Sequence, residues 1–262
     1  AAALSWFHRQ PDSPAKASFI GVAGIVLAGQ DPELFSQLTG NIDDPDLHRK
    51  SLVEGITSQG LSSLDAALAR FPELPDAASR GEVLQSLIMF HGQEHPRELL
   101  EVALSPAMET GNPQNNLGML LGQMAANDPS AALQWITSRP EPEIARLHRD
   151  SPGITIANLG RLDTAAVSAA AEALPAADRE WILANHYAGR PLEDPAAALA
   201  EASAALTGES LRAMTLTHLI QRSIRAGTEA QIDPWLNAQP EDTRTAIRGQ
   251  ISKLKAEAAA GK

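Results

Sequence analysis

The chain has 262 residues, of which 44% are hydrophobic and 4% aromatic, a formal net charge of −11 and no cysteine. The acidic balance argues against nonspecific nucleic-acid binding and against an anionic membrane face, since both need a basic surface. The absence of cysteine excludes disulfides, thiolate metal sites and a cysteine nucleophile, and no run reaches the roughly 18 apolar residues of a membrane span.

A short phrase recurs along the chain and indicates a repeat. It combines a small-residue helix start, a tryptophan and a proline five residues later, as in Ala2–Trp6 with Pro11 and Ala131–Trp135 with Pro140. Trp235 and Pro240 repeat the spacing from tryptophan to proline a third time. The copies lie at multiples of about 33 residues. A repeat of this length is typical of stacked helical hairpins that bury a continuous core only by touching their neighbours. Because Ala1 corresponds to Ser130, we expect the chain to begin inside a repeat.

The first helix of each unit is predicted to start at an Asp-Pro-like pair, with aspartate as N-cap and proline at the first helical position. These starts are Asp31-Pro32, Ser63-Leu64, His95-Pro96, Asp128-Pro129, Asp163-Thr164, Asp194-Pro195 and Asp233-Pro234. With the truncated first unit they give about eight units of about 33 residues. The fold class is therefore all-α, as a right-handed α-solenoid of about eight two-helix repeats.

The second helix of each unit begins with acidic residues after a proline and is expected to run for four or five turns. Its end is often a glycine, for which we expect a left-handed C-cap: Gly29, Gly60, Gly189 and Gly227. Glycines inside the second helices are Gly21, Gly24, Gly55, Gly118 and Gly122. They predict close packing between neighbouring hairpins, with a groove for a ligand backbone as the alternative.

One stretch departs from the pattern. Pro152 and Gly153 are predicted to break the second helix of the fifth unit. Residues 1–262 are expected to form a single helical-repeat domain, with two subarrays joined near 141–160 as the alternative. The stretch Gly111–Asn116 is the other loop-like segment. Irregular positions in a repeat array are where binding surfaces often differ.

A basic residue recurs near the start of the second helix in seven units: Lys16, Arg49, Arg80, Arg146, Arg179, Arg212 and Arg244. Stacked units would bring these side chains into a ladder. We expect a structural role, in which Arg179 and Arg212 hydrogen-bond carboxylates or helix-end carbonyls of their own or the next unit. The alternative is an anion-binding stripe.

No catalytic, cofactor or metal residue is predicted. His91 and His95 have the spacing of a helical metal pair, but Gly92 and Pro96 interrupt the helix and no third ligand is evident. Neighbouring residues of Asn185-His186-Tyr187 point about 100° apart on a helix, so they do not converge on one atom. The tryptophans Trp6, Trp135 and Trp235 are interpreted as core anchors of the first helices.

By length the units resemble tetratricopeptide-type and HEAT-type helical hairpins, although they lack the tetratricopeptide consensus Trp-x2-Leu-Gly-x2-Tyr. The phrase Asp-Pro-x-Ala-Ala-x-x-Trp, with Leu-Pro and a downstream arginine, resembles repeats of poorly characterised exported bacterial proteins. The resemblance implies a helical-repeat architecture, a binding scaffold and an exported or periplasmic bacterial location. It carries over no catalytic residue.

The sequence therefore predicts a non-catalytic scaffold that binds a protein or peptide, with no cofactor, no nucleic acid and no membrane span. The predicted contact residues lie where the repeat breaks: His148, Arg149, Asp150 and Asn158. The net charge favours a basic or neutral partner. The alternative is an α/α-toroid-like enzyme domain acting on polysaccharide or cell-wall material, which would need His186 or Tyr187 in a pocket with arginine and asparagine from another unit.

Overall fold

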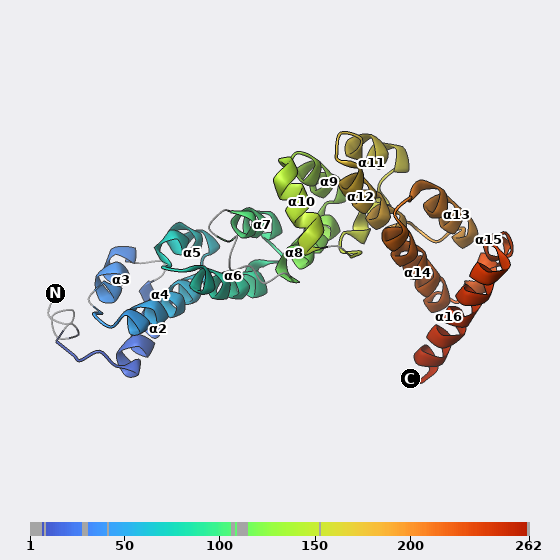
Figure 1. The fold of residues 1–262 in the computed structure, drawn as a ribbon. Coiled ribbons are helices and arrows are strands. Elements are labelled where there is room, and N and C mark those ends of the chain that lie inside the picture. Colours follow the sequence, from blue (N-terminus) through green and yellow to red (C-terminus); the bar gives the residue numbers. More distant parts are fainter. Residues whose placement is uncertain are drawn as a thin grey trace. The chain divides into compact units, whose positions relative to one another are not determined.

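The computed structural model describes residues 7, 9–27, 31–40, 42–105, 108, 115–151 and 153–260. Every regular element within these ranges is helical, with 15 α-helices and short 3-10 segments (Figure 1). The all-α class predicted from the sequence is therefore confirmed for the described part of the chain. None of these helices is both long and apolar enough to cross a membrane.

The chain divides into two compact units, Ala1–Leu120 and Leu121–Lys262. The helices that begin in the first unit are α2 (Pro14–Leu27), α3 (Pro32–Thr39), α4 (Pro45–Gly60), α5 (Leu64–Arg70), α6 (Ala77–His91), α7 (Pro96–Leu104) and α8 (Asn115–Asn127). A 3-10 turn, η1 (Phe71–Glu73), follows α5. The boundary between the units falls inside α8, upstream of residues 141–160.

The second unit contains the remaining helices. They are α9 (Pro129–Thr137), α10 (Glu141–Asp150), α11 (Thr164–Ala171), α12 (Ala176–Gly189), α13 (Pro195–Ala205), α14 (Glu209–Arg225), α15 (Asp233–Asn237) and α16 (Glu241–Ala260). Two 3-10 segments, η3 (Ala157–Arg161) and η4 (Glu229–Ile232), lie between them.

Short and long helices alternate along the chain, as the two-helix repeat predicts. In the first unit α3, α5 and α7 have 8, 7 and 9 residues, whereas α4 and α6 have 16 and 15. The long helices pack in chain order: α4 contacts both α2 and α6, and in the second unit α14 contacts both α12 and α16 (Figure 1). The handedness of the array and the number of its repeats stay predictions.

The short helices begin where the sequence placed them. At five of the predicted starts the N-cap side chain accepts a hydrogen bond from a backbone N–H group of the first turn. These N-caps are Asp31, Ser63, Asp128, Asp163 and Asp194. Such caps satisfy groups that have no partner inside a helix. Two starts differ: His95 makes no side-chain cap, and Asp233 lies inside α15, whose N-cap is Ile232.

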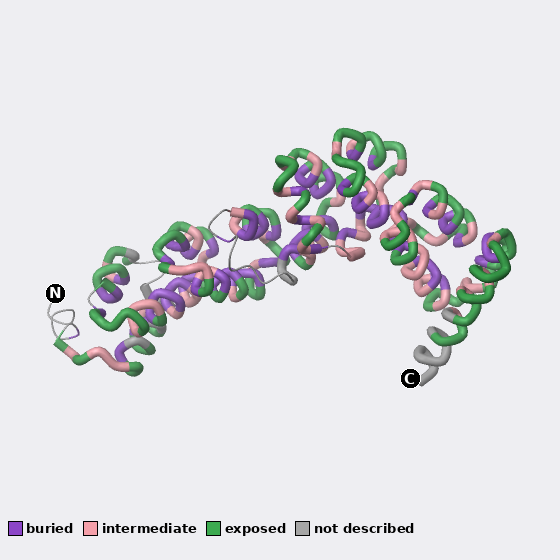
Figure 2. Tube along the Cα trace, viewed as in Figure 1, coloured by how far each residue is buried: buried purple, intermediate pink, exposed green. Residues whose placement is uncertain are grey.

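The predicted tryptophan anchors Trp135 and Trp235 are buried. Leu133, Leu87 and Leu199 also belong to the core. Buried positions run along the sides of the helices that face one another (Figure 2). Trp6, the third predicted anchor, lies outside the described residues.

The glycines that end helices mostly serve close packing. Among the described residues only Gly227 has a positive φ, of 70°, so the left-handed C-cap predicted for Gly60 and Gly189 is wrong. A Cβ at Gly60 would lie 2.3 Å from Leu87 Cδ2, and one at Gly189 would lie 1.5 Å from the Ala157 carbonyl oxygen. Tight packing, rather than backbone conformation, therefore requires glycine at both. Gly29 lies outside the described residues.

The predicted role of the helix-interior glycines is supported at two positions. A Cβ at Gly55 would lie 1.8 Å from the ring of Phe35, and one at Gly122 would lie 2.7 Å from the carbonyl oxygen of Thr155. Both are contacts within the protein, so these two glycines allow close packing of neighbouring elements.

Substitution of Gly189 by alanine is expected to lower the free energy of unfolding by about 2–4 kcal/mol, because the new methyl group would overlap the backbone of Ala157. Chemical denaturation followed by circular dichroism measures the effect. Gly249 is the matched control: it lies in α16, and a methyl group added there would have nothing within 4 Å, so alanine should stabilise by about 0.5–1 kcal/mol. Equal effects of the two substitutions would contradict the packing argument.

Candidate functional site

The segment that breaks the repeat lies against α12. α10 ends at Asp150, after only 10 residues, as Pro152 and Gly153 predicted. The chain then continues through irregular backbone into η3, which packs on α12. Backbone without a helix must find hydrogen-bond partners elsewhere, and α12 supplies them.

The amide of Asn185 binds the backbone of this segment. Its Oδ1 accepts hydrogen bonds from the backbone nitrogens of Thr155 and Ile156, both at 2.8 Å. Its Nδ2 donates to the carbonyl oxygen of Gly153 at 3.4 Å and to that of Trp181 at 3.0 Å. The side chain is fully buried, so all of its capacity is used to hold the polypeptide in place.

Two further side chains on the same face of α12 hold the end of α10. Trp181 Nε1 donates to the carbonyl oxygen of Ser151 at 3.0 Å. The ring of His148 stacks on Trp181 with centroids 5.5 Å apart, and its Nδ1 lies 3.0 Å from Asp178 Oδ1. Asp178, Trp181 and Asn185 are spaced at i, i+3 and i+7, which places them on one helix face.

His186 binds the beginning of the next hairpin. Its Nδ1 lies 3.0 Å from the carbonyl oxygen of Leu159, and its Nε2 lies 3.0 Å from Thr164 Oγ1. Because a carbonyl only accepts, Nδ1 carries the proton and donates. Burial lowers the pKa of His186, and the bond to Leu159 only partly offsets it. Tyr187 is also buried, and burial raises the pKa of its phenol. Both rings therefore belong to the core.

The four predicted contact residues differ in how much of each is used within the protein. His148 and Asp150 face the protein: His148 contacts α12, and Asp150 accepts from Arg149 Nε at 3.1 Å and lies 3.7 Å from Arg146 Nε. Arg149 itself is 70% exposed, and Asn158 is half-buried. Whether they bind a partner stays a prediction.

Sequence reasoning missed Asn185 as the residue that organises this region. It treated Asn185 only as a candidate for convergence with His186 and Tyr187. The usable signal was the spacing of Asp178, Trp181 and Asn185 on one helix face, about 30 residues after the Pro152-Gly153 break.

The basic column has a structural role at two of its members, Lys16 and Arg80. Lys16 Nζ donates to the carbonyl oxygen of Gln10 at 3.2 Å, and Arg80 Nη1 donates to that of Leu74 at 3.0 Å. In both cases the acceptor lies six residues upstream, in the loop that leads into the long helix. These bonds fix the loop to the helix that follows it.

The hydrogen bonds predicted for Arg179 and Arg212 are not formed, so that prediction is wrong. Neither guanidinium makes a hydrogen bond or an ion pair with a described residue, although Arg212 acts electrostatically on Glu180. Arg179 is exposed. Water satisfies an exposed guanidinium without the side-chain entropy cost of a fixed ion pair.

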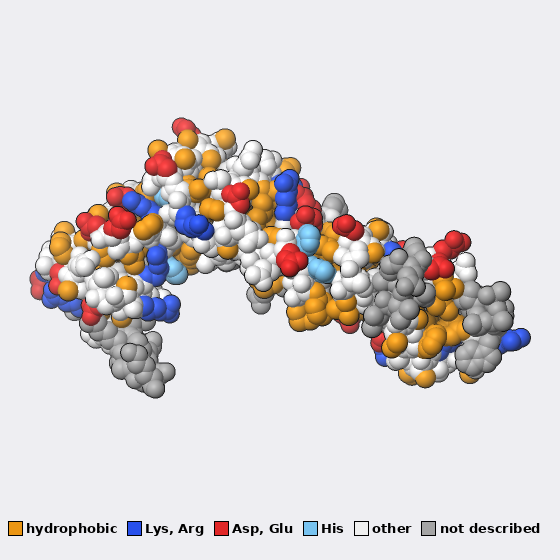
Figure 3. All heavy atoms as spheres, turned by 180° about the vertical axis from the view of Figure 1, so that it is seen from behind, with side chains coloured by type: hydrophobic (Ala, Val, Ile, Leu, Met, Phe, Trp, Pro, Cys, Tyr) orange, Lys and Arg blue, Asp and Glu red, His pale blue; other side chains and the backbone are white. Residues whose placement is uncertain are grey.

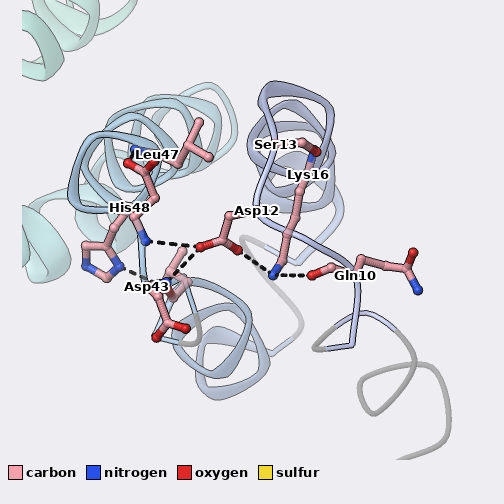
Figure 4. Close-up of polar contacts among 9 residues, drawn as sticks. Gln10, Asp12, Ser13, Lys16, Asp43, Leu47 and His48 are labelled. Atoms are coloured by element: carbon pink, nitrogen blue, oxygen red, sulfur yellow. Dashed lines mark hydrogen bonds and ion pairs between the residues drawn. The ribbon is translucent and has the colours of Figure 1, made fainter.

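Carboxylates of one hairpin cap the long helix of the next. Asp12 Oδ1 accepts from Lys16 Nζ at 2.8 Å, and its Oδ2 accepts from the backbone nitrogens of Asp43 and Asp44 at 2.9 and 3.0 Å, at the start of α4 (Figure 4). The bond from Lys16 is the main reason that the pKa of Asp12 lies below its usual range, and the bond from Asp44 adds to it.

Glu180 likewise accepts hydrogen bonds from the residues at the start of the long helix α14. Its Oε1 accepts from the backbone nitrogen of Gly208 at 2.6 Å and from the Thr207 hydroxyl at 3.0 Å. Burial raises the pKa of Glu180, but the hydrogen bonds from Gly208 and Thr207 together lower it by more.

Carbonyl groups at the C-terminal ends of the long helices also accept hydrogen bonds from the next hairpin. His91 Nε2 bonds the carbonyl oxygen of Gly60 at the end of α4. Arg222 Nη1 donates to the carbonyl oxygens of Ala188 and Arg190, at the end of α12. His91 therefore has a structural contact, and among the described residues no group of three or more His, Asp or Glu side chains is placed to hold a metal ion.

No protein-family model, curated protein or solved structure matches the chain. A functional proposal therefore rests on the geometry of the described residues.

Substitution of Asn185 by leucine is expected to reduce the free energy of unfolding by about 3 kcal/mol, because it leaves the backbone nitrogens of Thr155 and Ile156 without an acceptor. Urea denaturation measures the loss. The control is Asn158→Ala on the same segment, whose side chain makes no hydrogen bond to a described residue. That variant should stay within about 0.5 kcal/mol of the wild type. A similar loss in both would show that Asn185 has no special role.

Stability is expected to fall as the pH drops below about 6.5, because His186 binds a proton less readily in the folded than in the unfolded chain. Burial also lowers the pKa of His218, which adds a contribution of the same sign. The free energy of unfolding, measured between about pH 7.5 and 5.5, should depend less on pH in His186→Gln and least in the double variant with His218→Gln. An unchanged pH profile in the double variant would refute this assignment.

Proposed function

We propose that the chain is a non-catalytic scaffold that binds a protein or peptide along the outward surface of its long helices. The observation that carries this proposal is the regular link between successive hairpins. Hydrogen bonds from one hairpin to the next join residues 31, 28 and 34 positions apart, at Asp12–Asp43, Glu180–Gly208 and Arg222–Ala188. Such similar sequence separations favour an α-solenoid, in which each hairpin stacks on the next, as the arrangement within the all-α class.

An array of this type offers a long, preformed surface. Each hairpin contacts only its neighbours, so the outward side of every long helix stays available over many repeats. Extended polypeptides suit such surfaces, whereas a small reactive substrate needs a concave pocket that surrounds it.

Exposed apolar side chains on the long helices support this proposal. On α6, Met89 is 72% exposed and Phe90 is 48% exposed. Adjacent exposed apolar residues of this size mark interaction surfaces more often than isolated ones do, and methionine adapts to partners of different shape. The exposed Arg149 at the repeat break is a second contact candidate.

The net charge of −11 biases recognition at long range towards basic or neutral partners. This bias acts mainly on the association rate, and salt screens it over about 8–10 Å.

The test is affinity capture with the full chain as bait, followed by direct titration of each captured protein against the purified chain. We expect one partner whose affinity falls at least about tenfold in Met89→Glu/Phe90→Glu, because the substitutions bury charge without a partner. The matched control is Ser168→Glu/Ala169→Glu, which adds the same two charges at exposed positions of the short helix α11 and should leave the affinity unchanged. Lack of direct binding by every captured protein would contradict the proposal, as would hydrolysis of a polysaccharide panel abolished by one substitution.

A further inference from the structure

Three cationic or titratable side chains form a stripe along α14. His218, Arg222 and Arg225 are spaced at i, i+4 and i+7, which places them on one helix face. Viewed from behind, the surface over the C-terminal helices shows blue Lys and Arg side chains beside a pale-blue imidazole (Figure 3). The chain has 32 acidic against 21 basic residues, so a cationic stripe without acidic partners is unexpected.

Among the described residues, no carboxylate forms an ion pair with this stripe. Burial is the one cause that lowers the pKa of Arg222. Burial comes first for the pKa of His218 as well, and the charged groups that add to it are Arg222 and Arg225, which both lower it further. None of the three side chains forms an ion pair with a described residue.

The contacts of Arg222 use only one end of its guanidinium. Nη1 donates to the carbonyl oxygens of Ala188 at 2.5 Å and Arg190 at 2.9 Å, which accounts for both of its hydrogens. Nε and Nη2 carry the three remaining hydrogens, and Nε–H and one Nη2–H point out along the opposite edge. They have no acceptor among the described residues. A role in capping α12 therefore explains Nη1 but leaves this edge unexplained.

The unused edge has the geometry that binds a carboxylate. Two parallel N–H groups of a guanidinium match the two oxygens of a carboxylate, and partial burial strengthens the pair. The bonds of Nη1 to the end of α12 fix the orientation of the fork before a ligand arrives, which lowers the entropy cost of binding. His218 lies about one turn before Arg222 on α14, and Arg225 lies about one turn after it. Both supply further hydrogen-bond donors on the same helix face.

We propose that the Nε/Nη2 edge of Arg222, together with His218 and Arg225, binds a carboxylate of an acidic peptide segment. This inference rests on the proposed function, because it names the chemistry of the peptide that the scaffold would hold. A nucleic acid is a poorer fit: it requires a long basic surface, whereas these three side chains stand on a chain of net charge −11.

The overall acidity of the chain does not prevent such a contact. Charges more than about 8–10 Å apart are largely screened at physiological salt. The local stripe then decides whether a carboxylate binds, while the distant acidic residues mainly slow its approach.

The experiment is a fluorescence-anisotropy titration of the full chain with a labelled glutamate–glycine peptide at low salt. The reference ligand is the same peptide with glutamine in place of glutamate. We expect the glutamate peptide to bind at least about tenfold more tightly, since hydrogen bonds between two charged groups are roughly twice as strong as those between neutral ones.

Three variants locate the site. Arg222→Lys keeps the positive charge and removes the fork, while His218→Gln and Arg225→Gln leave the contacts to α12 intact. Each should weaken the glutamate peptide by about three- to tenfold. The matched control is Arg179→Gln, which removes an equal charge from an exposed site on α12 and should leave the affinity unchanged. Thermal unfolding checks that Arg222→Lys is folded.

Several results would overturn the proposal. The proposal fails if the glutamate peptide does not bind or if the glutamine peptide binds equally tightly. It also fails if Arg179→Gln and Arg225→Gln lose the same affinity, or if a single-stranded oligonucleotide binds more tightly through the same residues. Failure here is distinguishable from failure of the scaffold proposal. A captured partner that depends on Met89 and Phe90 but not on Arg222 would refute the carboxylate site alone.

Discussion

The ends of the long helices impose the constraint on which the rest of the structure depends. A helix leaves backbone donors at its start and acceptors at its end without partners. In this chain the neighbouring hairpin supplies many of them: Glu180 binds the first backbone groups of α14, and Arg222 binds the last carbonyls of α12. One hairpin therefore completes the next, and the stability of each depends on its neighbours.

The break in the repeat is a variation on the same constraint. α10 ends early, and the irregular segment behind it has backbone groups that no helix of its own satisfies. Asn185, Trp181 and His186 meet this need from α12. These polar and aromatic side chains of α12 are thereby occupied by the protein itself. Under the proposed function, a partner would be recognised by groups that the fold leaves exposed.

Arg222 connects these two aspects. Its Nη1 group contributes to the fold by capping α12, and its Nε/Nη2 edge is held in a fixed orientation as a result. A side chain with one end anchored loses less entropy when the other end binds. The same reasoning separates it from Arg179, which is exposed and carries the same charge, but has no anchoring contact.

The sequence alone determined the features that depend on neighbouring residues: the Asp-Pro helix starts at Asp128 and Asp194, the end of α10 before Pro152, and the burial of Trp135. Capping and helix breaking act over one turn, and amphipathic spacing repeats along a single helix. Tertiary structure alone decided the rest. Gly189 is glycine because the backbone of Ala157 approaches it, and Asn185 matters because Thr155 lies beside it. These partners lie about 30 residues apart in the chain, and their contact depends on how one hairpin packs on the next, which no local pattern encodes.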